Sequence, residues 1–499
     1  MLRGLLIFGI LVQVTYCAVI SSCPAYGCRP SGTFSYLIDI QSKEPEVFWN
    51  TTYGAIPDSL GCVGNLNNIV CPYKGPKSNG YVGIGSDNGN QMWYDTVLHD
   101  PSLPVMDIEG GIIGTDGHYM VKYEADGTQI KPSKPVDPSL FPLYSVQLSD
   151  NGMLVFASMN GVMFAMDTAG IPLASISFNG SVERFNGSFL PVSTPIIVGT
   201  RVYVLTEFRP DEDTPESRMP NILGMRRLYA VDIFLRMVDR LHTTWYFNFE
   251  REDPETKNSR LSKELKANEK DTTLRFKPRQ PVQGNPLLMA NIQEEVIYVI
   301  LPPPETNGDE PPMFWAIKDD GDDASLLYKR TISASRMAMY EINGSLKHKS
   351  KSNIKTKSKL FDAISSKSVQ EVAIPIWLLS ESKSSIYKVN PTDGSIELTV
   401  NLTSVLEGVS EVTSDMMVSR SDDKGTDNVI FGITLKTSTI TNYIMSLDSN
   451  GEMQWKVPTP SNVAVIGQIA GISSEGTNSD DMLVAFGNNK DSGSVFAIK

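Results

Sequence analysis

Two adjoining stretches, Met153-Leu-Val-Phe-Ala-Ser-Met-Asn-Gly161 and Val162-Met-Phe-Ala-Met-Asp-Thr-Ala-Gly170, decide the fold class of this chain. Each places a run of apolar residues before a polar turn that ends in glycine. Asn and Asp side chains bond their own backbone in such turns, and glycine tolerates a positive φ. The pair therefore predicts two short β-strands joined by a tight reversal, with apolar side chains directed into a core.

The same unit recurs along the chain. The clearest further copies are Ile112–Gly117 with Val121–Gly127, Phe314–Gly321, Tyr387–Gly394 and Met445–Gly451. Four such strands make a small twisted sheet that cannot bury both of its faces alone, and radial repetition of the sheet solves that problem. We therefore predict an all-β fold of the β-propeller type.

The number of blades follows from the residue that ends the second strand of each unit. These positions are Asp39, Asp95, Glu124, Asp167, Asp232, Lys318, Asn390, Asp448 and Lys499. The first and last copies are incomplete, so we expect the N- and C-terminal strands to close the ring by sharing one blade. Nine positions minus one shared blade give eight blades, with seven as the alternative.

Three copies resemble the repeat of quinoprotein alcohol dehydrogenase-like (PQQ-like) β-propellers, which carries an aromatic-Ala-apolar-Asp strand, a glycine turn and a Trp in the next strand. They are Met163–Asp167, Leu228–Asp232 and Asp448–Trp455. The resemblance covers residues 33–499. Propellers of this kind include quinone-dependent dehydrogenases, bacterial outer-membrane assembly scaffolds and lumenal sensor domains, so the resemblance implies a fold rather than an activity.

The dehydrogenases of that family hold their quinone beside a disulfide between adjacent cysteines, with a calcium ion and an Asp base nearby. This sequence has no adjacent cysteine pair, no Cys-x-x-Cys-His motif and only four scattered histidines. We therefore assign no catalytic, cofactor-binding or metal-binding residue and predict no cofactor, while PQQ and calcium stay open as alternatives. The carboxylates of Asp319–Asp323 are of the kind that binds calcium, but we interpret them as a solvated turn between strands.

The N-terminus has the features of a signal peptide. Arg3 precedes an apolar core from Leu5 to Val12, and Thr15 and Cys17 offer a cleavage point after residue 17. An uncleaved membrane anchor is the alternative, but this apolar run is shorter than a bilayer requires. We predict that residues 1–17 are removed and that the mature protein, without a transmembrane segment, is secreted into the extracellular space or the lumen of the secretory pathway.

Four cysteines remain after that cleavage, namely Cys23, Cys28, Cys62 and Cys71. In an oxidising compartment an even number near the mature N-terminus predicts two disulfides, with three pairings open. A metal site is the alternative, although the spacing lacks the close pairs that zinc sites prefer. We expect a cysteine-containing N-terminal segment over residues 18–32, followed by the propeller over residues 33–499.

Several Asn-x-Ser/Thr sequons occur in the same chain, which in a secreted protein makes their asparagines candidate glycan acceptors on exposed turns. They are Asn50, Asn179, Asn186, Asn343 and Asn401. Together with the signal peptide they predict a glycoprotein.

Insertions interrupt the repeats at about 207–226, 249–281, 302–312 and 347–360. All four fall between the fourth and sixth repeats, so we expect them to project from neighbouring blades and to form a binding surface. The last contains a lysine run that is a candidate site for a polyanion such as a sulfated glycan, with a solvated loop as the alternative. Its lysines are Lys347, Lys349, Lys351, Lys355, Lys357 and Lys359.

The overall charge restricts the partners. With 44 Lys+Arg against 57 Asp+Glu, the net charge is −13, which disfavours nucleic acid because phosphate binding needs a concentrated basic face. We predict a secreted, non-catalytic recognition scaffold for an extracellular protein or glycan, bound through the insertions of blades 4–6 or the central funnel. The alternatives are a secreted quinone- or metal-dependent oxidoreductase with a divergent site, and an acidic extracellular-matrix or mineral-associated component.

Overall fold

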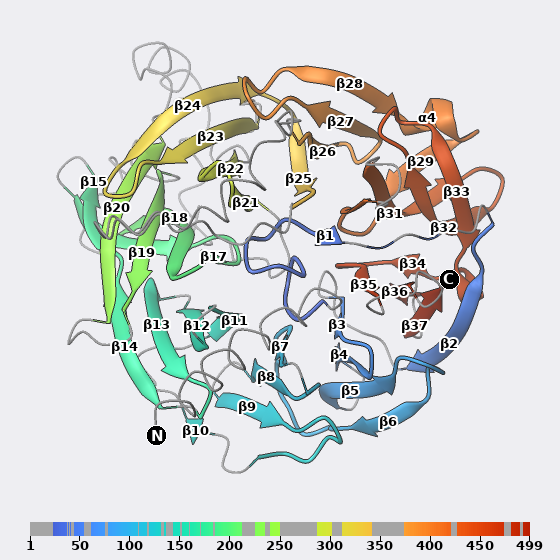
Figure 1. The fold of residues 1–499 in the computed structure, drawn as a ribbon, viewed down its shortest axis with the longest axis horizontal. Coiled ribbons are helices and arrows are strands. Elements are labelled where there is room, and N and C mark those ends of the chain that lie inside the picture. The colour runs from blue at the N-terminus through green and yellow to red at the C-terminus, as the bar shows by residue number, and fades with distance from the viewer. Residues whose placement is uncertain are drawn as a thin grey trace, which may run out of the picture.

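The computed structural model describes residues 23–499 with gaps. The residues outside the description are 1–22, 37, 39, 41–43, 54–60, 75–77, 108, 117–118, 131–133, 136–142, 150–151, 159, 170, 183–184, 212–224, 235–239, 250–286, 302–311, 342–373, 421–426, 474–480 and 490–492. The described strands form eight sheets that stand side by side in a ring (Figure 1). The prediction of an all-β propeller with eight blades is therefore confirmed.

Each blade is an antiparallel sheet whose strands we call A to D from the axis to the rim. Blades 1–3 comprise β3 (Val63–Gly64), β4 (Asn68–Lys74), β5 (Asn79–Gly85) and β6 (Gln91–Tyr94); β7 (Val105–Met106), β8 (Ile112–Thr115), β9 (Tyr119–Tyr123) and β10 (Lys134–Pro135); and β11 (Leu143–Leu148), β12 (Met153–Ser158), β13 (Val162–Asp167) and β14 (Pro172–Ser177).

Blades 4–6 carry the insertions. They comprise β15 (Asn179–Val182), β16 (Phe185–Pro191), β17 (Ile196–Val198), β18 (Arg201–Pro210), β19 (Arg226–Ile233) and β20 (Leu241–Phe249); β21 (Leu288–Asn291), β22 (Val296–Leu301), β23 (Met313–Asp319) and β24 (Ala324–Thr331); and β25 (Ala334–Met339), β26 (Ile376–Ser380), β27 (Ser385–Val389) and β28 (Ile396–Asn401).

Blades 7 and 8 contain strands from both ends of the chain. They comprise β29 (Val409–Val412), β30 (Met417–Arg420), β31 (Asp427–Lys436), β32 (Ile440–Leu447) and β33 (Met453–Pro458), with β1 (Ser35–Tyr36) on the axial side; and β34 (Ala464–Val465), β35 (Ala470–Ile472), β36 (Met482–Asn488), β37 (Gly493–Ile498) and β2 (Val47–Tyr53). The helices among the described residues are the short α4 (Leu402–Val405) and η4 (Pro460–Asn462). Neither has the length and apolarity to cross a membrane.

The hairpin predicted from the two stretches between Met153 and Gly170 forms as expected. In blade 3, β12 and β13 pair antiparallel with Met153 opposite Asp167, and the rings of Phe156 and Phe164 stack with centroids 5.0 Å apart. All of β12 is buried, whereas the outer strand β14 keeps exposed positions along its length. Middle strands are packed on both faces by neighbouring blades, which explains their continuous apolar runs.

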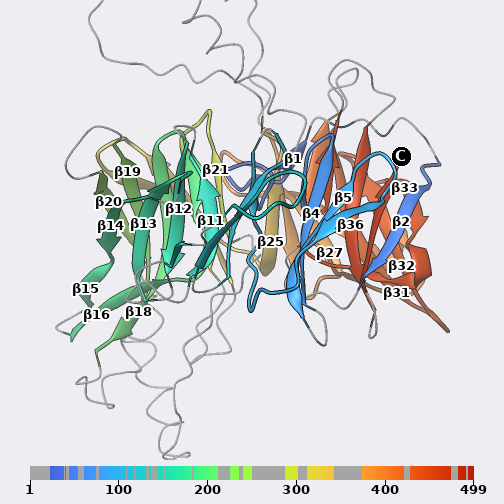
Figure 2. The ribbon, with the colours of Figure 1, turned by 90° about the horizontal axis from the view of Figure 1, so that it is seen from below.

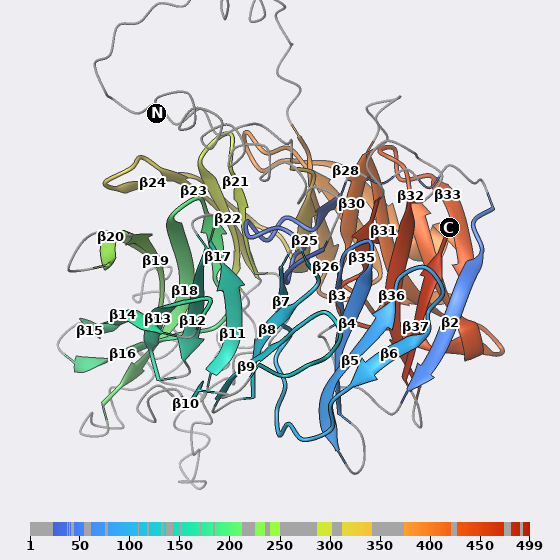
Figure 3. The same ribbon diagram turned by 60° about the horizontal axis from the view of Figure 1, so that its bottom comes forward.

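The two chain ends share blade 8, as predicted. β2 pairs antiparallel with β37, which places a strand from the N-terminal part of the chain at the rim of a sheet built otherwise from the C-terminal part (Figure 3). Beyond the strands, Glu46 and Lys499 exchange both backbone hydrogen bonds, at 3.0 and 3.1 Å. This pairing closes the ring without a covalent connection.

Aromatic side chains on outer strands pack several blades against the next one. Trp49 of β2 donates its indole N–H to the Ser86 carbonyl of blade 1 at 2.9 Å and packs over Gly89, whose φ is +71°. Trp93 of β6 lies in the same way over Gly127 of blade 2. The glycine turns are therefore docking positions as well as chain reversals, because a Cβ would occupy the space of the ring.

The propeller has two faces, which an edge-on view separates (Figure 2). Because the strands of a blade alternate in direction, the B–C and D–A connections open on one face and the A–B and C–D connections on the other. We call these the D–A face and the A–B face. The connections 212–224, 250–286 and 302–311 start and end on the D–A face, and the connection 342–373 between β25 and β26 does so on the A–B face. The insertions themselves lie outside the described residues.

Candidate functional site: an occupied axis

The centre of the ring is filled by the chain's own N-terminal segment, residues 23–36, which we call the axial plug (Figure 1). Its backbone carbonyls accept hydrogen bonds from amides of the inner strands of blades 2, 4, 5, 6 and 7. The pairs are Pro24 with Met106 (2.7 Å), Pro30 with Ile197 (2.7 Å), Ser31 with Ala290 (3.0 Å), Thr33 with Met339 (3.0 Å) and Phe34 with Val418 (2.9 Å).

The two ends of the plug add strand-like pairing. Cys23 exchanges backbone hydrogen bonds with Gly64 of blade 1 at 2.8 and 2.9 Å. At the other end, β1 runs parallel to β30 of blade 7, with Ser35 opposite Val418. With the contacts of Gln468 in blade 8, the described hydrogen bonds join the plug to seven of the eight blades. One short segment thus ties together elements from nearly the whole chain.

Interrupted inner strands supply the polar partners of the plug. The A strand of blade 7 is broken between β29 and β30, and that of blade 8 between β34 and β35. Asp415 and Gln468 lie in these breaks, and each is about 1 % exposed. The backbone in these breaks forms isolated bridges, Gly61 with Gln468 and Ser414 with Gly467, and the side chains of Asp415 and Gln468 bond the plug.

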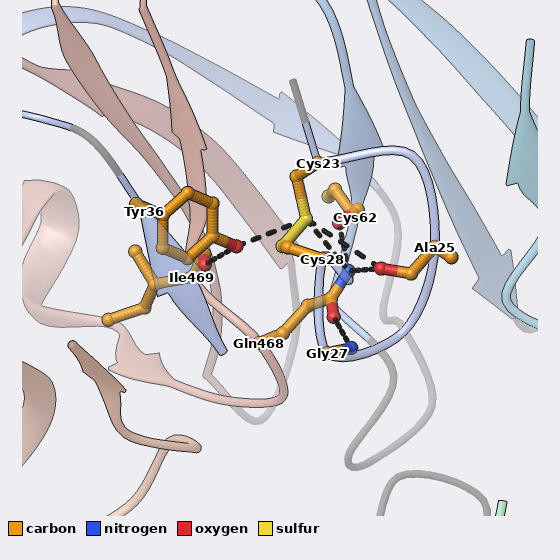
Figure 4. Close-up of a disulfide and its surroundings, with 8 residues drawn as sticks. All are labelled: Cys23, Ala25, Gly27, Cys28, Tyr36, Cys62, Gln468 and Ile469. Atoms are coloured by element: carbon orange, nitrogen blue, oxygen red, sulfur yellow. Dashed lines mark hydrogen bonds between the residues drawn. A yellow bond between two sulfur atoms is a disulfide. The ribbon is translucent and has the colours of Figure 1, made fainter. Parts of the chain in front are cut away.

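Gln468 is the centre of a hydrogen-bond network around the Cys23–Cys28 disulfide (Figure 4). Its Nε2 donates to the carbonyls of Cys62 (2.7 Å) and Ala25 (3.3 Å), and its Oε1 accepts from the Gly27 amide (2.9 Å). A buried amide side chain satisfied in this way specifies the position of all its partners. Gln468 therefore joins the plug, blade 1 and blade 8.

A buried carboxylate, that of Asp415, holds the plug on its other side. The Tyr26 hydroxyl donates to Asp415 Oδ2 at 3.2 Å, and Arg336 Nε of β25 lies 3.4 Å from Asp415 Oδ1. Burial raises the pKa of Asp415 to about 6, which Arg336 opposes. Burial also raises the pKa of the Tyr26 hydroxyl, so this hydroxyl stays a donor at neutral pH.

A second carboxylate binds the hydroxyls of the plug. Glu341, directly after β25, accepts from Thr33 Oγ1 at 3.0 Å and from Ser31 Oγ, and its amide donates to Ser35 Oγ at 2.8 Å. These groups satisfy one another, and they hold the plug against blade 6.

The described residues do not contain the adjacent-cysteine disulfide of the quinone site that the PQQ-like resemblance implies. Both disulfides join cysteines that are separated in sequence, Cys23–Cys28 and Cys62–Cys71, and neither is the adjacent pair of the dehydrogenases. Residues 23–36 lie at the centre of the ring. Among the described residues no three His, Cys, Asp or Glu side chains gather as ligands for a metal ion. We therefore derive no step through a quinone.

The other candidates from the sequence are distributed over the surface or lie outside the description. The prediction of two disulfides is confirmed, and their pairing is now defined. Four of the sequon asparagines are exposed on strands or strand ends, namely Asn50, Asn179, Asn186 and Asn401. Asn343 and the lysine run from Lys347 to Lys359 fall outside the described residues.

The interpretation of Asp319–Asp323 as a solvated turn is wrong for its first member. Asp319 is buried and accepts hydrogen bonds from Arg201 Nη1 (2.8 Å), Tyr203 (2.5 Å) and Trp245 Nε1 (3.0 Å), all from blade 4. Its carboxylate thus binds blade 5 to blade 4, because the strand before it ends inside the interface between them. The remaining residues of the turn are exposed, as expected.

Sequence reasoning missed the residues around the plug. Gln468 interrupts an apolar stretch and Asp415 directly precedes one, and a polar residue beside apolar residues is the available signal. That signal does not reveal the partner, because Gln468 and Gly27 are separated by 441 positions.

Comparisons with known proteins find matches among solved structures. No protein family matches the sequence, and no curated protein matches it. Among solved structures, the quinohemoprotein alcohol dehydrogenase ADHIIG of Pseudomonas putida HK5 is similar over 97 % of this chain and 81 % of its own, at 9 % identity and a TM-score of 0.45. BamB of Moraxella catarrhalis is similar over 90 % of this chain and 97 % of its own, at 9 % identity and a TM-score of 0.44.

Proposed function

We propose that this protein is a secreted glycoprotein whose propeller serves as a non-catalytic recognition scaffold for an extracellular protein or glycan. The observation that carries the proposal is the axial plug, because a channel filled by the chain itself leaves the faces and the rim of the ring for partners. The central funnel is accordingly no longer part of the binding hypothesis.

The D–A face is the favoured binding surface. Three connections of blades 4 and 5 begin and end there, namely 212–224, 250–286 and 302–311. Loops gathered on one side of a rigid scaffold are a frequent means of building a recognition surface. The connection that contains the lysine run starts and ends on the opposite, A–B face, so the run serves as a separate test of polyanion binding.

The experiment is a binding assay with two matched variants of the secreted protein. One replaces residues 250–286 with a flexible linker, and the other changes the six lysines of the run to glutamine. Loss of a protein or glycan partner in the first variant alone supports the D–A face, and loss in the second alone assigns binding to the lysine run. Retained binding in both variants refutes the role of the insertions.

Ligand-dependent melting tests the oxidoreductase alternative. A ligand that binds the folded state alone must raise the melting temperature. A rise of several degrees with PQQ and calcium, together with a new absorbance band, contradicts a non-catalytic scaffold. Glycosylation is tested separately by mass spectrometry before and after enzymatic removal of N-glycans, with Asn50, Asn179, Asn186 and Asn401 as the exposed acceptors.

An acidic matrix or mineral-associated component is a second candidate, favoured by the charge on the A–B face. The C–D turns of several blades expose carboxylates there, including those of Asp87, Asp126, Asp322, Asp393 and Glu452. Weak calcium binding at many sites, measured by titration calorimetry, distinguishes this function from specific recognition of one partner.

A further inference from the structure

Two sets of contacts, which we call fasteners, hold the ring closed between its first and last blades. The pairing of β2 with β37 holds the rim of blade 8, where the two ends of the chain meet. At the axis, Gln468 of blade 8 bonds the carbonyl of Cys62 in blade 1 together with Ala25 and Gly27 of the plug (Figure 4). If either fastener opens, strand edges that the ring normally covers are exposed.

The Cys23–Cys28 disulfide gives the plug the shape that the axial fastener needs. Within this loop the Cys28 amide donates to Ala25 at 3.0 Å, and Gly27 and Cys28 both have positive φ, +77° and +55°. A residue with a Cβ rarely adopts that conformation unless its surroundings hold it there. One end of the loop pairs with Gly64 of blade 1, and the other bonds Gln468 of blade 8. The Cys23–Cys28 loop therefore connects blade 1 with blade 8.

Burial determines when this disulfide can form. Cys23 and Cys28 are 0 % and 1 % exposed, and Cys23 Sγ accepts contacts from the Tyr36 hydroxyl (3.1 Å) and Gln468 Nε2 (3.5 Å). Thiol–disulfide exchange requires access to the sulfur atoms, so oxidation has to precede seating. The two cysteines are five positions apart and can meet early, whereas Gln468 is translated near the end of the chain.

We propose that oxidation of Cys23 and Cys28 is the condition for seating the axial plug, which makes closure of the ring an oxidation-dependent step. The oxidant is a disulfide-bearing oxidoreductase. One cysteine thiolate attacks the oxidant's disulfide to form a mixed disulfide, and the second displaces the remaining oxidant thiol. The oxidant leaves as a dithiol that carries the two electrons and two protons. In a reducing compartment the plug stays unseated.

The test is amide hydrogen exchange on the full chain, with two disulfide variants compared. In the variant C23S/C28S, we expect the amides of Met106, Ile197, Ala290, Met339 and Val418 to exchange at least tenfold faster than in the wild type, because each donates to the plug. In the matched control C62S/C71S, faster exchange is expected to stay within the β3–β4 hairpin. Unchanged exchange of those amides in C23S/C28S overturns the proposal.

A refolding experiment keeps the proposal testable if C23S/C28S does not reach the folded state. The C62S/C71S variant retains only the plug disulfide among the cysteines of the described residues and is refolded from urea either oxidised or with dithiothreitol. The oxidised form should protect the five amides, and the reduced form should protect β12 and β13 of blade 3 but not the five amides. Equal protection of the five amides in both forms refutes the proposal.

Discussion

Replacing Gly89 with alanine should loosen the contact between blades 8 and 1. Gly89 has a φ of +71°, and an added Cβ would lie 2.5 Å from Cε3 of Trp49, so the indole must move. The left-handed conformation alone costs alanine about 1–2 kcal/mol. Displacing Trp49 also breaks its hydrogen bond to Ser86, at about 1 kcal/mol. Exposing roughly 100 Å² of indole adds about 2.5 kcal/mol.

Gly152 is the matched control. Its φ is +77°, and an added Cβ meets nothing within 4 Å. Gly152→Ala should therefore carry the conformational cost only, and Gly89→Ala should lower the free energy of unfolding by about 3.5 kcal/mol more than Gly152→Ala does, a large part of the 5–15 kcal/mol of a typical protein. Urea unfolding followed by tryptophan fluorescence measures both variants. Equal midpoints and equal slopes for Gly89→Ala and Gly152→Ala would contradict the docking argument.

A double-mutant cycle provides an independent check of the same contact. If the cost of Gly89→Ala comes from displacing the indole, most of it should disappear in a background in which Trp49 is already alanine. Additive effects of the two substitutions would mean that Gly89 acts on the turn alone.

Three further predictions concern buried polar groups. Because the folded-state pKa of Asp415 is raised to about 6, above its unfolded value, this carboxyl contributes stability at low pH that is lost as the pH rises through 6. Relative to Asp415→Asn, the wild type should gain about 1 kcal/mol between pH 7 and pH 5, and identical pH profiles would exclude this carboxyl as the cause. Asp319→Asn should destabilise by about 3 kcal/mol, since Arg201 then keeps a carboxylate partner only on its own blade, whereas Asp323→Asn at the exposed end of the same turn should change the midpoint little. Gln468→Leu leaves two buried backbone groups unpaired and should cost about 2–5 kcal/mol, read as a lowered thermal midpoint, and a neutral effect would show that water replaces the amide.

Local patterns in the sequence account for the fold. Alternation and glycine turns, as in Met153–Gly170, define hairpins over short distances, and incomplete copies at both ends require a shared blade. The number of cysteines likewise implies two disulfides, because this inference depends on count and compartment rather than on geometry. Short-range physics is sufficient for each of these features.

Only the tertiary structure decided what fills the axis and which face each connection leaves. The plug bonds residues as far along the chain as Gln468 and Ile469, and such pairs leave no trace in local periodicity. The burial of Asp319 depends in the same way on Arg201 from a neighbouring blade. A side chain's partner across a blade interface is set by the closed ring as a whole, since the sequence specifies strands one at a time and the ring brings their ends together.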